Sequence, residues 1–182
     1  MFNANDVKVT GTGSKYQTAG VSEKVKITEV VHIHNETFDA HYLQLKTTNE
    51  NEQAGLSKRL SLNTTVNPGK SVAAWVVSAK YLLGILMSIG LSETDAKKVL
   101  AADSREGLIK NLENSLIGKE FRGLFTSREY QPGKYAIELY NTEPVGGTRL
   151  VYDPNNSTHN SKLTAGPGDG MSTPKSKDDL PF

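Results

Sequence analysis

The order in which strand-like and helix-like segments follow one another constrains this chain more than any other feature. Apolar and polar residues alternate with a period of two over Lys24–His34, His41–Thr48 and Lys58–Asn63. These segments predict three consecutive antiparallel strands joined by loops. Glu29 falls in the apolar phase of the first segment, which indicates a bulge or a strand shared between two sheets.

Helix-like sequence replaces this alternation over residues 71–118. Capping patterns predict three helices in this region. The expected caps are Ser71 before an apolar stretch, Ser92 with Asp95, and Asp103 with Glu106. The third helix is expected over Ser104–Ile117, and Gly118 is placed to end it.

Strand-like sequence then returns in three segments, which are Lys119–Tyr130, Lys134–Asn141 and Thr148–Tyr152. The chain is therefore expected to be mainly β, with a helical insertion between its third and fourth strands. A five-stranded antiparallel barrel with a helical element at that point is the arrangement of the oligonucleotide/oligosaccharide-binding fold, the OB-fold. Other small barrels share the same order of elements.

One apolar segment, Val72–Leu91, approaches the length of a membrane span. Lys80 lies in its middle, and two serines and two glycines dilute it, so a central buried helix of a soluble protein is the better interpretation. The first residues, Met1–Asp6, lack the basic and apolar pattern of an export signal. We therefore expect the protein in the cytoplasm.

Composition divides the chain into three zones. Residues 1–20 are polar and rich in Gly and Thr, and they are expected to be a flexible extension. Residues 21–153 carry the pattern of one folded domain. Residues 154–182 are mostly Pro, Gly, Ser, Thr, Asn and Lys, so a disordered tail is expected there because such a segment cannot build a core.

The tail carries a compact acidic and aromatic tip, formed by Asp178, Asp179, Leu180, Pro181 and Phe182. A short anionic segment with an aromatic ring suits a pocket that has an apolar floor and a rim of Lys or Arg. The tip resembles the acidic C-terminal tip of bacterial and bacteriophage single-stranded DNA-binding proteins, which end in several Asp, an apolar residue, Pro and Phe. This resemblance implies an OB-fold body and a tip that recruits replication, recombination and repair proteins. The long insertion and the single tryptophan, Trp75, favour a divergent bacteriophage-type member, for which the expected cytoplasm is that of the host cell.

The chain has 21 Lys and Arg and 20 Asp and Glu, so it is not basic overall. Net positive charge therefore gives no support for nucleic-acid binding. A binding groove must then come from the placement of charges. Single-strand sites combine cations for phosphates with aromatic rings on which bases stack. Such residues recur on outward strand positions and near them: Lys24, Lys26, Tyr42, Lys46, Lys58, Arg59, Arg122, Arg128, Tyr130, Tyr140, Arg149 and Tyr152.

Three histidines supply the best enzymatic alternative. His32 and His34 share one strand face, and the following turn is able to place His41 opposite His34, as in the three-imidazole sites of zinc hydrolases. Only Glu36 and Asp39 lie nearby as a general base, and the hairpin faces outward. The chain has no cysteine for thiolate chemistry. The sequence is therefore interpreted as having no metal site, cofactor or catalytic centre.

Together these features predict a non-enzymatic protein that coats single-stranded DNA without sequence preference. It would protect single strands in replication, recombination and repair and dock partner proteins through its tip. A replisome adaptor whose barrel binds protein instead of DNA is the main alternative, and a metal-dependent hydrolase is the other. The oligomeric state, the length of DNA occupied and the identity of the partners do not follow from the sequence.

Overall fold

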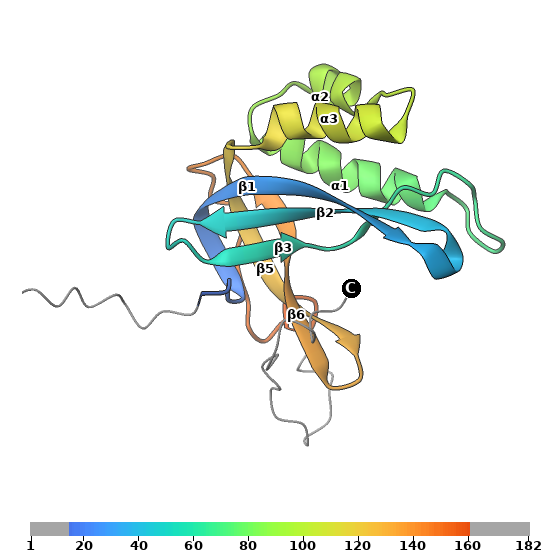
Figure 1. The fold of residues 1–182 in the computed structure, drawn as a ribbon. Helices are drawn as coiled ribbons and strands as arrows, with labels where there is room; N and C mark the ends of the chain where they lie inside the picture. Colours follow the sequence, from blue (N-terminus) through green and yellow to red (C-terminus); the bar gives the residue numbers. More distant parts are fainter. Residues whose placement is uncertain (1–14, 161–182) are drawn as a thin grey trace, which may run out of the picture.

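The computed structural model describes residues 15–160, which form a six-stranded sheet and three α-helices (Figure 1). The strands are β1 (Gly20–Asn35), β2 (Ala40–Asn49), β3 (Ala54–Ser57), β4 (Leu60–Ser61), β5 (Glu120–Gln131) and β6 (Lys134–Glu143). The helices are α1 (Ala74–Ser88), α2 (Glu93–Leu100) and α3 (Arg105–Leu116), and a single 3-10 turn, η2 (Glu36–Phe38), joins β1 to β2. The expected mainly β chain with a helical insertion is confirmed, and the insertion lies between β4 and β5.

The long strand β1 organises the sheet because it pairs with two different strands. Its first half is antiparallel to β5, from Gly20 to Lys26, and most of its length is antiparallel to β2. The pairing with β2 shifts register between Ile27 and Glu29. The predicted bulge at Glu29 is therefore confirmed, and the bulge helps one strand to serve two neighbours.

The sheet returns on itself through a parallel pair. The strand order is β1-β5-β6-β3-β2-β4, and the additional β1–β2 pairing closes a ring of five strands that is not a regular barrel. β3 and β6 pair in parallel, with Leu56 opposite Glu138 and Ser57 opposite Leu139. The prediction of an all-antiparallel five-stranded barrel is wrong in this respect. Strand directions cannot alternate around a closed ring with an odd number of strands, so one neighbouring pair has to be parallel.

The predicted third strand, Lys58–Asn63, is replaced by two short strands, β3 and β4, that both pair with β2. The break has a local cause in the buried hydroxyl of Ser57. This Oγ accepts a hydrogen bond from the Leu45 amide at 2.9 Å and donates to the Lys58 carbonyl at 2.8 Å. A side chain thus takes a position in the ladder that a backbone group would otherwise hold, and Lys58 and Arg59 lie outside both strands.

The predicted last strand, Thr148–Tyr152, is not a strand. The amides of Arg149 and Leu150 donate to the carboxylate of Glu143 instead of to a neighbouring strand. The chain then runs back along β5, where the Ser127 amide donates to the carbonyl of His159 at 3.0 Å. The folded part therefore continues past the predicted boundary at residue 154.

The predicted start of the domain at residue 21 is also too late. The Ala54 amide donates to the Lys15 carbonyl at 2.9 Å, and the Gln17 amide donates to the Ala54 carbonyl at 2.7 Å. Residues 15–17 thus already contact β3. The tail tip, Asp178–Phe182, lies outside the described residues, as do residues 1–14 and the rest of 161–182.

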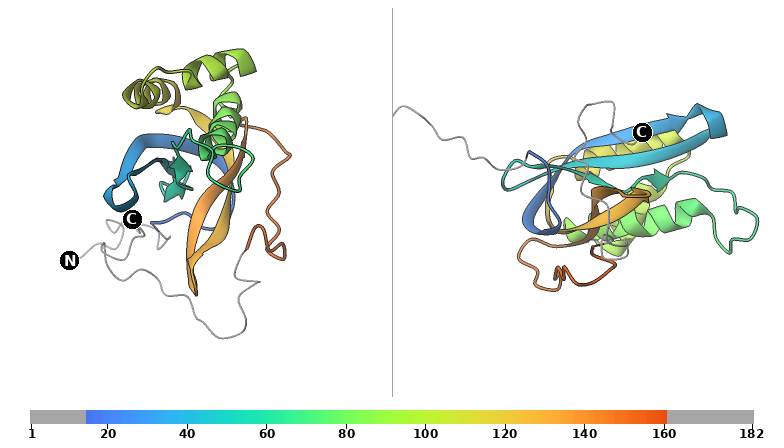
Figure 2. Two further views of the ribbon diagram at one scale, coloured as in Figure 1. Left: turned by 90° about the vertical axis from the view of Figure 1, so that its right-hand side faces the viewer. Right: turned by 90° about the horizontal axis from the view of Figure 1, so that it is seen from below.

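The three helices gather at one end of the sheet, and the β5–β6 hairpin points to the opposite end (Figures 1 and 2). The core between helices and sheet is apolar. Its largest fully buried side chains are Ile27, Leu43, Leu45, Leu60, Leu82, Ile85, Leu86, Leu112, Leu116, Phe121, Phe125 and Leu139. The expectation that the 72–91 segment forms a buried helix is thus met by the inner face of α1. Among the described residues, no helix combines the length and apolar character of a membrane span.

The helix boundaries test the capping patterns directly. Ser92 caps α2 by accepting from the Asp95 amide, as predicted. The cap of α3 is Ser104 and not Asp103, since the Ser104 hydroxyl accepts from the Gly107 amide. α1 begins after Ala73 without a side-chain cap, so the predicted Ser71 cap is wrong. Gly118 ends α3 as predicted: it has a φ of 78° and donates its amide hydrogen to the Ile27 carbonyl.

Candidate functional site

Four of the predicted binding residues come together on one part of the sheet. Tyr42 and Lys46 lie on the outward side of β2, while their neighbours Leu43 and Leu45 are fully buried. Lys58 and Arg59 connect β3 and β4, which pair with the two ends of the same strand. We call Tyr42, Lys46, Lys58 and Arg59 the β2 face. It joins one aromatic ring with three cations, as the sequence predicts for a single-strand site.

The two lysines of the β2 face have different surroundings, because Lys46 is exposed and Lys58 is half-buried against Tyr81 of α1. Lys46 Nζ lies 2.8 Å from an oxygen of Glu29, and the two side chains are 51% and 54% exposed. Lys58 Nζ lies 4.7 Å from the centre of the Tyr81 ring, whose hydroxyl donates to the Leu139 carbonyl at 2.6 Å. The Lys46–Glu29 ion pair is so exposed that it contributes at most about 1 kcal/mol to the stability of the fold. A phosphate is therefore able to replace Glu29 at Lys46 at little cost.

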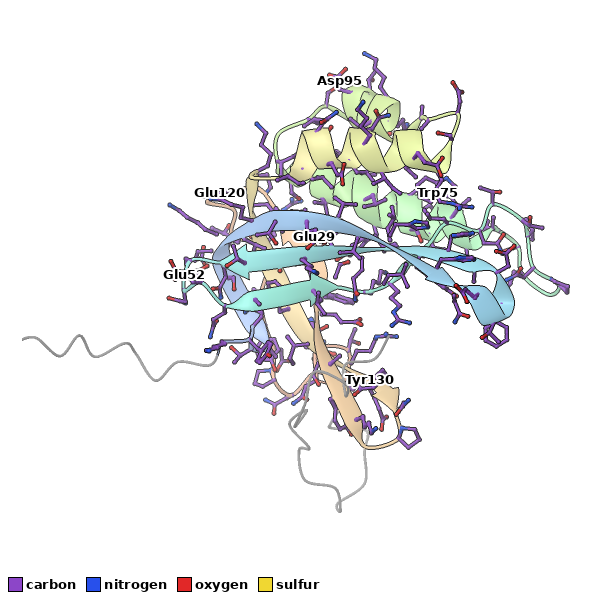
Figure 3. All side chains as sticks on the ribbon, in the orientation of Figure 1. Glu29, Glu52, Trp75, Asp95, Glu120 and Tyr130 are labelled. Carbon is purple, nitrogen blue, oxygen red and sulfur yellow. The ribbon has the colours of Figure 1, made fainter. Side chains whose placement is uncertain are left out.

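Two hairpins flank the β2 face. The β1–β2 hairpin and the β5–β6 hairpin project from the sheet in different directions (Figure 1). The first carries Phe38, which is 78% exposed at its turn and which the sequence reasoning did not select. An aromatic residue in an otherwise polar turn was the available signal. The second carries Arg128 and Tyr130, and Tyr130 is marked near its tip in Figure 3.

Arg128 is held across the second hairpin. Its Nε lies 2.8 Å from Oε2 of Glu138, and a second guanidinium nitrogen lies 3.1 Å from Oε1 of the same carboxylate. This bidentate pair fixes the guanidinium plane beside β6, although the Arg128 side chain remains largely exposed. Arg128 thus keeps an accessible edge, but one carboxylate already competes for it.

Lys24 and Lys26 lie at the other end of β1 from its hairpin. This part of the strand pairs with β5, and Lys26 Nζ lies 3.5 Å from Glu120. The Lys24 side chain is exposed, and its backbone amide donates to Glu50. Lys26 nevertheless lies opposite Thr48, two positions from Lys46 on β2, whereas Lys24 lies further toward the start of β1.

Arg122 has a structural role, because its guanidinium connects separate parts of the folded chain. Its Nε donates to Glu23 at 2.8 Å, a second nitrogen donates to Glu143, and the same nitrogen lies 3.2 Å from the Leu150 carbonyl. The Glu143 side chain is only 2% exposed and also accepts from the amides of Arg149 and Leu150. This cluster attaches the segment after β6 to β5, which leaves little of Arg122 for a ligand.

The electrostatics of Glu143 follow from these contacts. Burial acts to raise the pKa of its carboxyl, but hydrogen bonds from Arg122 and from the two backbone amides lower the pKa overall. Arg149 is exposed and its Nε lies 3.7 Å from Glu143, so it belongs to the rim of the same cluster. The sequence reasoning missed Glu143, because nothing in its local pattern shows that it becomes buried.

Tyr140 and Tyr152 meet at a histidine that was not predicted. The Tyr140 ring lies edge-on to His159 at 6.1 Å between centres, and the Tyr152 ring stacks on His159 at 5.9 Å. His159 Nδ1 also accepts from the Asp153 amide. These rings therefore form an aromatic cluster that holds the segment after β6, with Tyr140 still 47% exposed.

The three histidines come together as the alternative reading expected. His34 and His41 are directly opposite on β1 and β2, and their rings stack at 4.1 Å. His32 Nε2 lies 3.1 Å from His41 Nδ1. Asp39 joins them, with one carboxylate oxygen 2.9 Å from His34 Nε2 and 3.6 Å from His41 Nε2. The hairpin thus gathers three imidazoles and one carboxylate.

Comparison with known proteins does not assign this chain to a family. No protein-family model matches the chain, and no curated protein is significantly similar to it in sequence. The resemblance to single-stranded DNA-binding proteins therefore depends on the order of strands, the charged face and the tail tip alone.

Proposed function

We propose that the protein is a non-enzymatic, sequence-independent single-stranded DNA-binding protein with an OB-type body. In an OB-fold, the face of strands 2 and 3 and the loops that join strands 1–2 and 4–5 bind oligonucleotides. The corresponding elements here are β2 with β3, the β1–β2 hairpin and the β5–β6 hairpin. The β2 face lies on the first of these elements and the two hairpins flank it.

The single observation that carries the proposal is the composition of the β2 face. Lys46, Lys58 and Arg59 supply three cationic side chains on β2 and on the connection of its two neighbours, and the half-buried ring of Tyr42 lies on the same strand. Each base stacked on an aromatic side chain contributes about 1–3 kcal/mol by alanine substitution. Phe38 offers a second exposed ring at the adjoining hairpin. The near-neutral total charge is compatible with this site because the cations are local.

The remaining predicted residues take different places in the proposal. Arg128 and Tyr130 extend the proposed DNA-binding surface along the β5–β6 hairpin. Lys24 and Lys26 lie where a longer DNA single strand would continue. Arg122 is assigned to the fold together with Glu143. Tyr140, Tyr152 and Arg149 flank the segment after β6 and are peripheral to this surface.

A pair of matched double variants tests the β2 face. Lys46→Ala/Lys58→Ala and Lys97→Ala/Lys98→Ala each remove two lysines, and Lys97 and Lys98 form exposed ion pairs on α2 away from the sheet. Fluorescence anisotropy with labelled oligothymidine in low salt should show a loss of about tenfold or more for the first variant only. Its plot of log affinity against log salt should also become shallower by about 1.4, since each lost phosphate contact removes about 0.7 for a single strand.

Two results would overturn the proposal. If the wild-type protein binds oligothymidine with a Kd above about 1 mM, the binding is weaker than ordinary non-specific binding. That result favours the replisome adaptor instead. Equal loss for both double variants would show that net charge and not the β2 face governs binding. Strong preference for one base composition would contradict sequence-independent stacking.

We further propose that the tip, Asp178–Phe182, docks replication or recombination proteins. The support is its anionic and aromatic chemistry, which suits a cationic pocket with an apolar floor. Deletion of residues 178–182, or Phe182→Ala alone, should abolish recovery of such partners from host lysate while oligothymidine affinity stays equal or rises. Lys175→Ala is the matched control in the same tail. A deletion that destroys DNA binding would contradict this division of roles.

A further inference from the structure

We propose that the β1–β2 hairpin binds one divalent transition-metal ion through His34, Asp39 and His41. The inference concerns a different part of the molecule from the β2 face and does not depend on DNA binding. The interpretation of the sequence excludes a metal site because the histidines lie on an outward hairpin without an obvious general base. The structure adds a carboxylate at the centre of the cluster, which the spacing of the histidines alone did not show.

The donor atoms are already close enough for one ion. One nitrogen each from His34 and His41 and one oxygen of Asp39 lie within 4.8 Å of one another. Ligands at about 2.0–2.2 Å from zinc lie roughly 3.3 Å apart in a tetrahedral site. The distances of 2.9 Å and 3.6 Å from the Asp39 oxygen to the two imidazole nitrogens bracket that separation. The separations of the donor atoms therefore fit one ion.

The backbone explains why Asp39 reaches the two imidazoles. His34 and His41 form a directly opposed cross-strand pair at the end of the hairpin. Asp39 lies between them in the turn with a φ of 45°, in the left-handed region, and its amide donates to the Glu36 carbonyl. A non-glycine residue in this region is uncommon and is tolerated best by Asn and Asp. The turn therefore holds a carboxylate beside the histidine pair.

The side chains have the freedom that binding requires. The His34 and His41 rings are nearly parallel, with an interplanar angle of 8°, so at least one ring must turn about its Cβ–Cγ bond to aim its lone pair at a shared ion. The His34 side chain is 42% exposed and the Asp39 side chain is 87% exposed. Both are able to move without disturbing the core. Metal binding should thus break the stacked arrangement.

His32 acts as a positioning residue. When His41 donates its Nδ1 hydrogen to His32 Nε2, which is 3.1 Å away, the Nε2 lone pair of His41 faces Asp39. Metal-ligating histidines commonly fix their ring orientation through such a bond from the second nitrogen. At His34, an ion would replace the hydrogen that now lies between Nε2 and the Asp39 oxygen.

The donor set selects the class of ion. Two imidazoles and one carboxylate suit zinc, nickel, cobalt or copper, whereas magnesium and calcium prefer oxygen ligands alone. Three protein ligands leave at least one coordination position for water or another group. The proposal is for metal binding only and assigns no reaction to the hairpin.

The test is a zinc titration of the full chain without an affinity tag, by isothermal titration calorimetry. We expect one zinc ion per chain with a Kd of about 10 µM or tighter. His34→Ala and Asp39→Asn should each weaken binding at least about tenfold to 100-fold, and the matched control His159→Ala should not change it. Magnesium at millimolar concentration should not compete.

Nitrogen NMR of the imidazole rings supplies a second readout that a folding defect would not imitate. Zinc should shift the Nε2 signals of His34 and His41, while Nδ1 of His41 stays protonated toward His32. His32→Ala should weaken zinc binding by about 10–100-fold and change the tautomer of His41, with an unchanged circular dichroism spectrum. Absence of saturable binding below about 1 mM, or binding that survives His34→Ala with Asp39→Asn, would overturn the proposal.

Discussion

Two ion pairs on the same sheet, Lys46–Glu29 and Arg122–Glu143, show how similar sequence positions acquire opposite roles. Each joins a strand cation to a carboxylate on a neighbouring strand. The Lys46 and Glu29 side chains are 51% and 54% exposed, whereas those of Arg122 and Glu143 are 12% and 2% exposed. Water screens the first pair, so a ligand is able to exchange with it. The second pair is surrounded by protein, and losing Glu143 leaves the Arg122 guanidinium with only the exposed carboxylate of Glu23 as an ionic partner among the described residues.

The alternation of side chains along a strand therefore identifies outward positions but not the depth at which they lie. Lys46 and Arg122 both satisfy the pattern expected of a phosphate ligand. The returning segment after β6 covers Arg122 and places the Leu150 carbonyl 3.2 Å from its guanidinium. A cation is available to a ligand only where no distant part of the chain covers it.

The largest effect is expected when the buried carboxylate is removed. Glu143→Gln should lower the melting temperature by about 10 °C, because Arg122 then faces a neutral amide in a buried site. Scanning calorimetry measures this change, and Glu29→Gln is the matched control that should leave the melting temperature nearly unchanged. Oligothymidine affinity of the folded Glu143→Gln protein should equal that of the wild type. If the two substitutions destabilise equally, burial does not distinguish the pairs.

Acidification should have a smaller effect of the same origin. Because the folded protein lowers the pKa of the Glu143 carboxyl, its stabilisation is complete above the ordinary carboxyl pKa and is lost as the pH falls through the lowered value. The difference in melting temperature between wild type and Glu143→Gln should therefore be constant near neutral pH and shrink in acid. The use of a difference removes the contributions of Asp39, Glu93 and Asp95, which titrate in both proteins. A difference that grows on acidification would reverse the assigned sign.

The smallest expected effect is on the exposed pair and has the opposite direction. Glu29→Gln removes the carboxylate that competes with phosphate for Lys46, so oligothymidine affinity in low salt should rise about two- to fivefold. Glu120→Gln, which frees Lys26 outside the β2 face, is the control and should give a smaller rise. Equal gains from both substitutions would place the DNA path along β1 instead of β2.

Local periodicity predicted most of the fold. The segments of β1, β2, β5 and β6 and the helices α2 and α3 were visible because each buries one face against the core, which imposes a period of two or 3.6. The failures share a different cause. Ser57 interrupts a strand with its own hydroxyl, and Glu143 draws the amides of Arg149 and Leu150 away from strand pairing. A side chain that replaces a backbone hydrogen-bond partner does not change the alternation of apolar and polar residues, so the sequence pattern does not reveal it.

The candidate site was predictable to the same degree. Tyr42 and Lys46 could be placed on one face because they share a strand, and the turn between β1 and β2 could be expected to oppose His34 and His41. The meeting of Arg122 with Glu23 joins residues 99 positions apart and could not be expected from either neighbourhood. The role of Asp39 depends on a left-handed backbone angle in the turn, which sequence patterns do not specify.

The parallel seam between β3 and β6 also bears on how the molecule folds. Its two residue pairs join Leu56 to Glu138 and Ser57 to Leu139, so the three helices and β5 lie in the loop that must close before the seam forms. Closing a loop of this length has an entropic cost that the two hairpins do not bear. The hairpins and helices should therefore form early and the ring last. In the native protein, the same seam is where hydrogen exchange is expected to detect the first opening of the sheet.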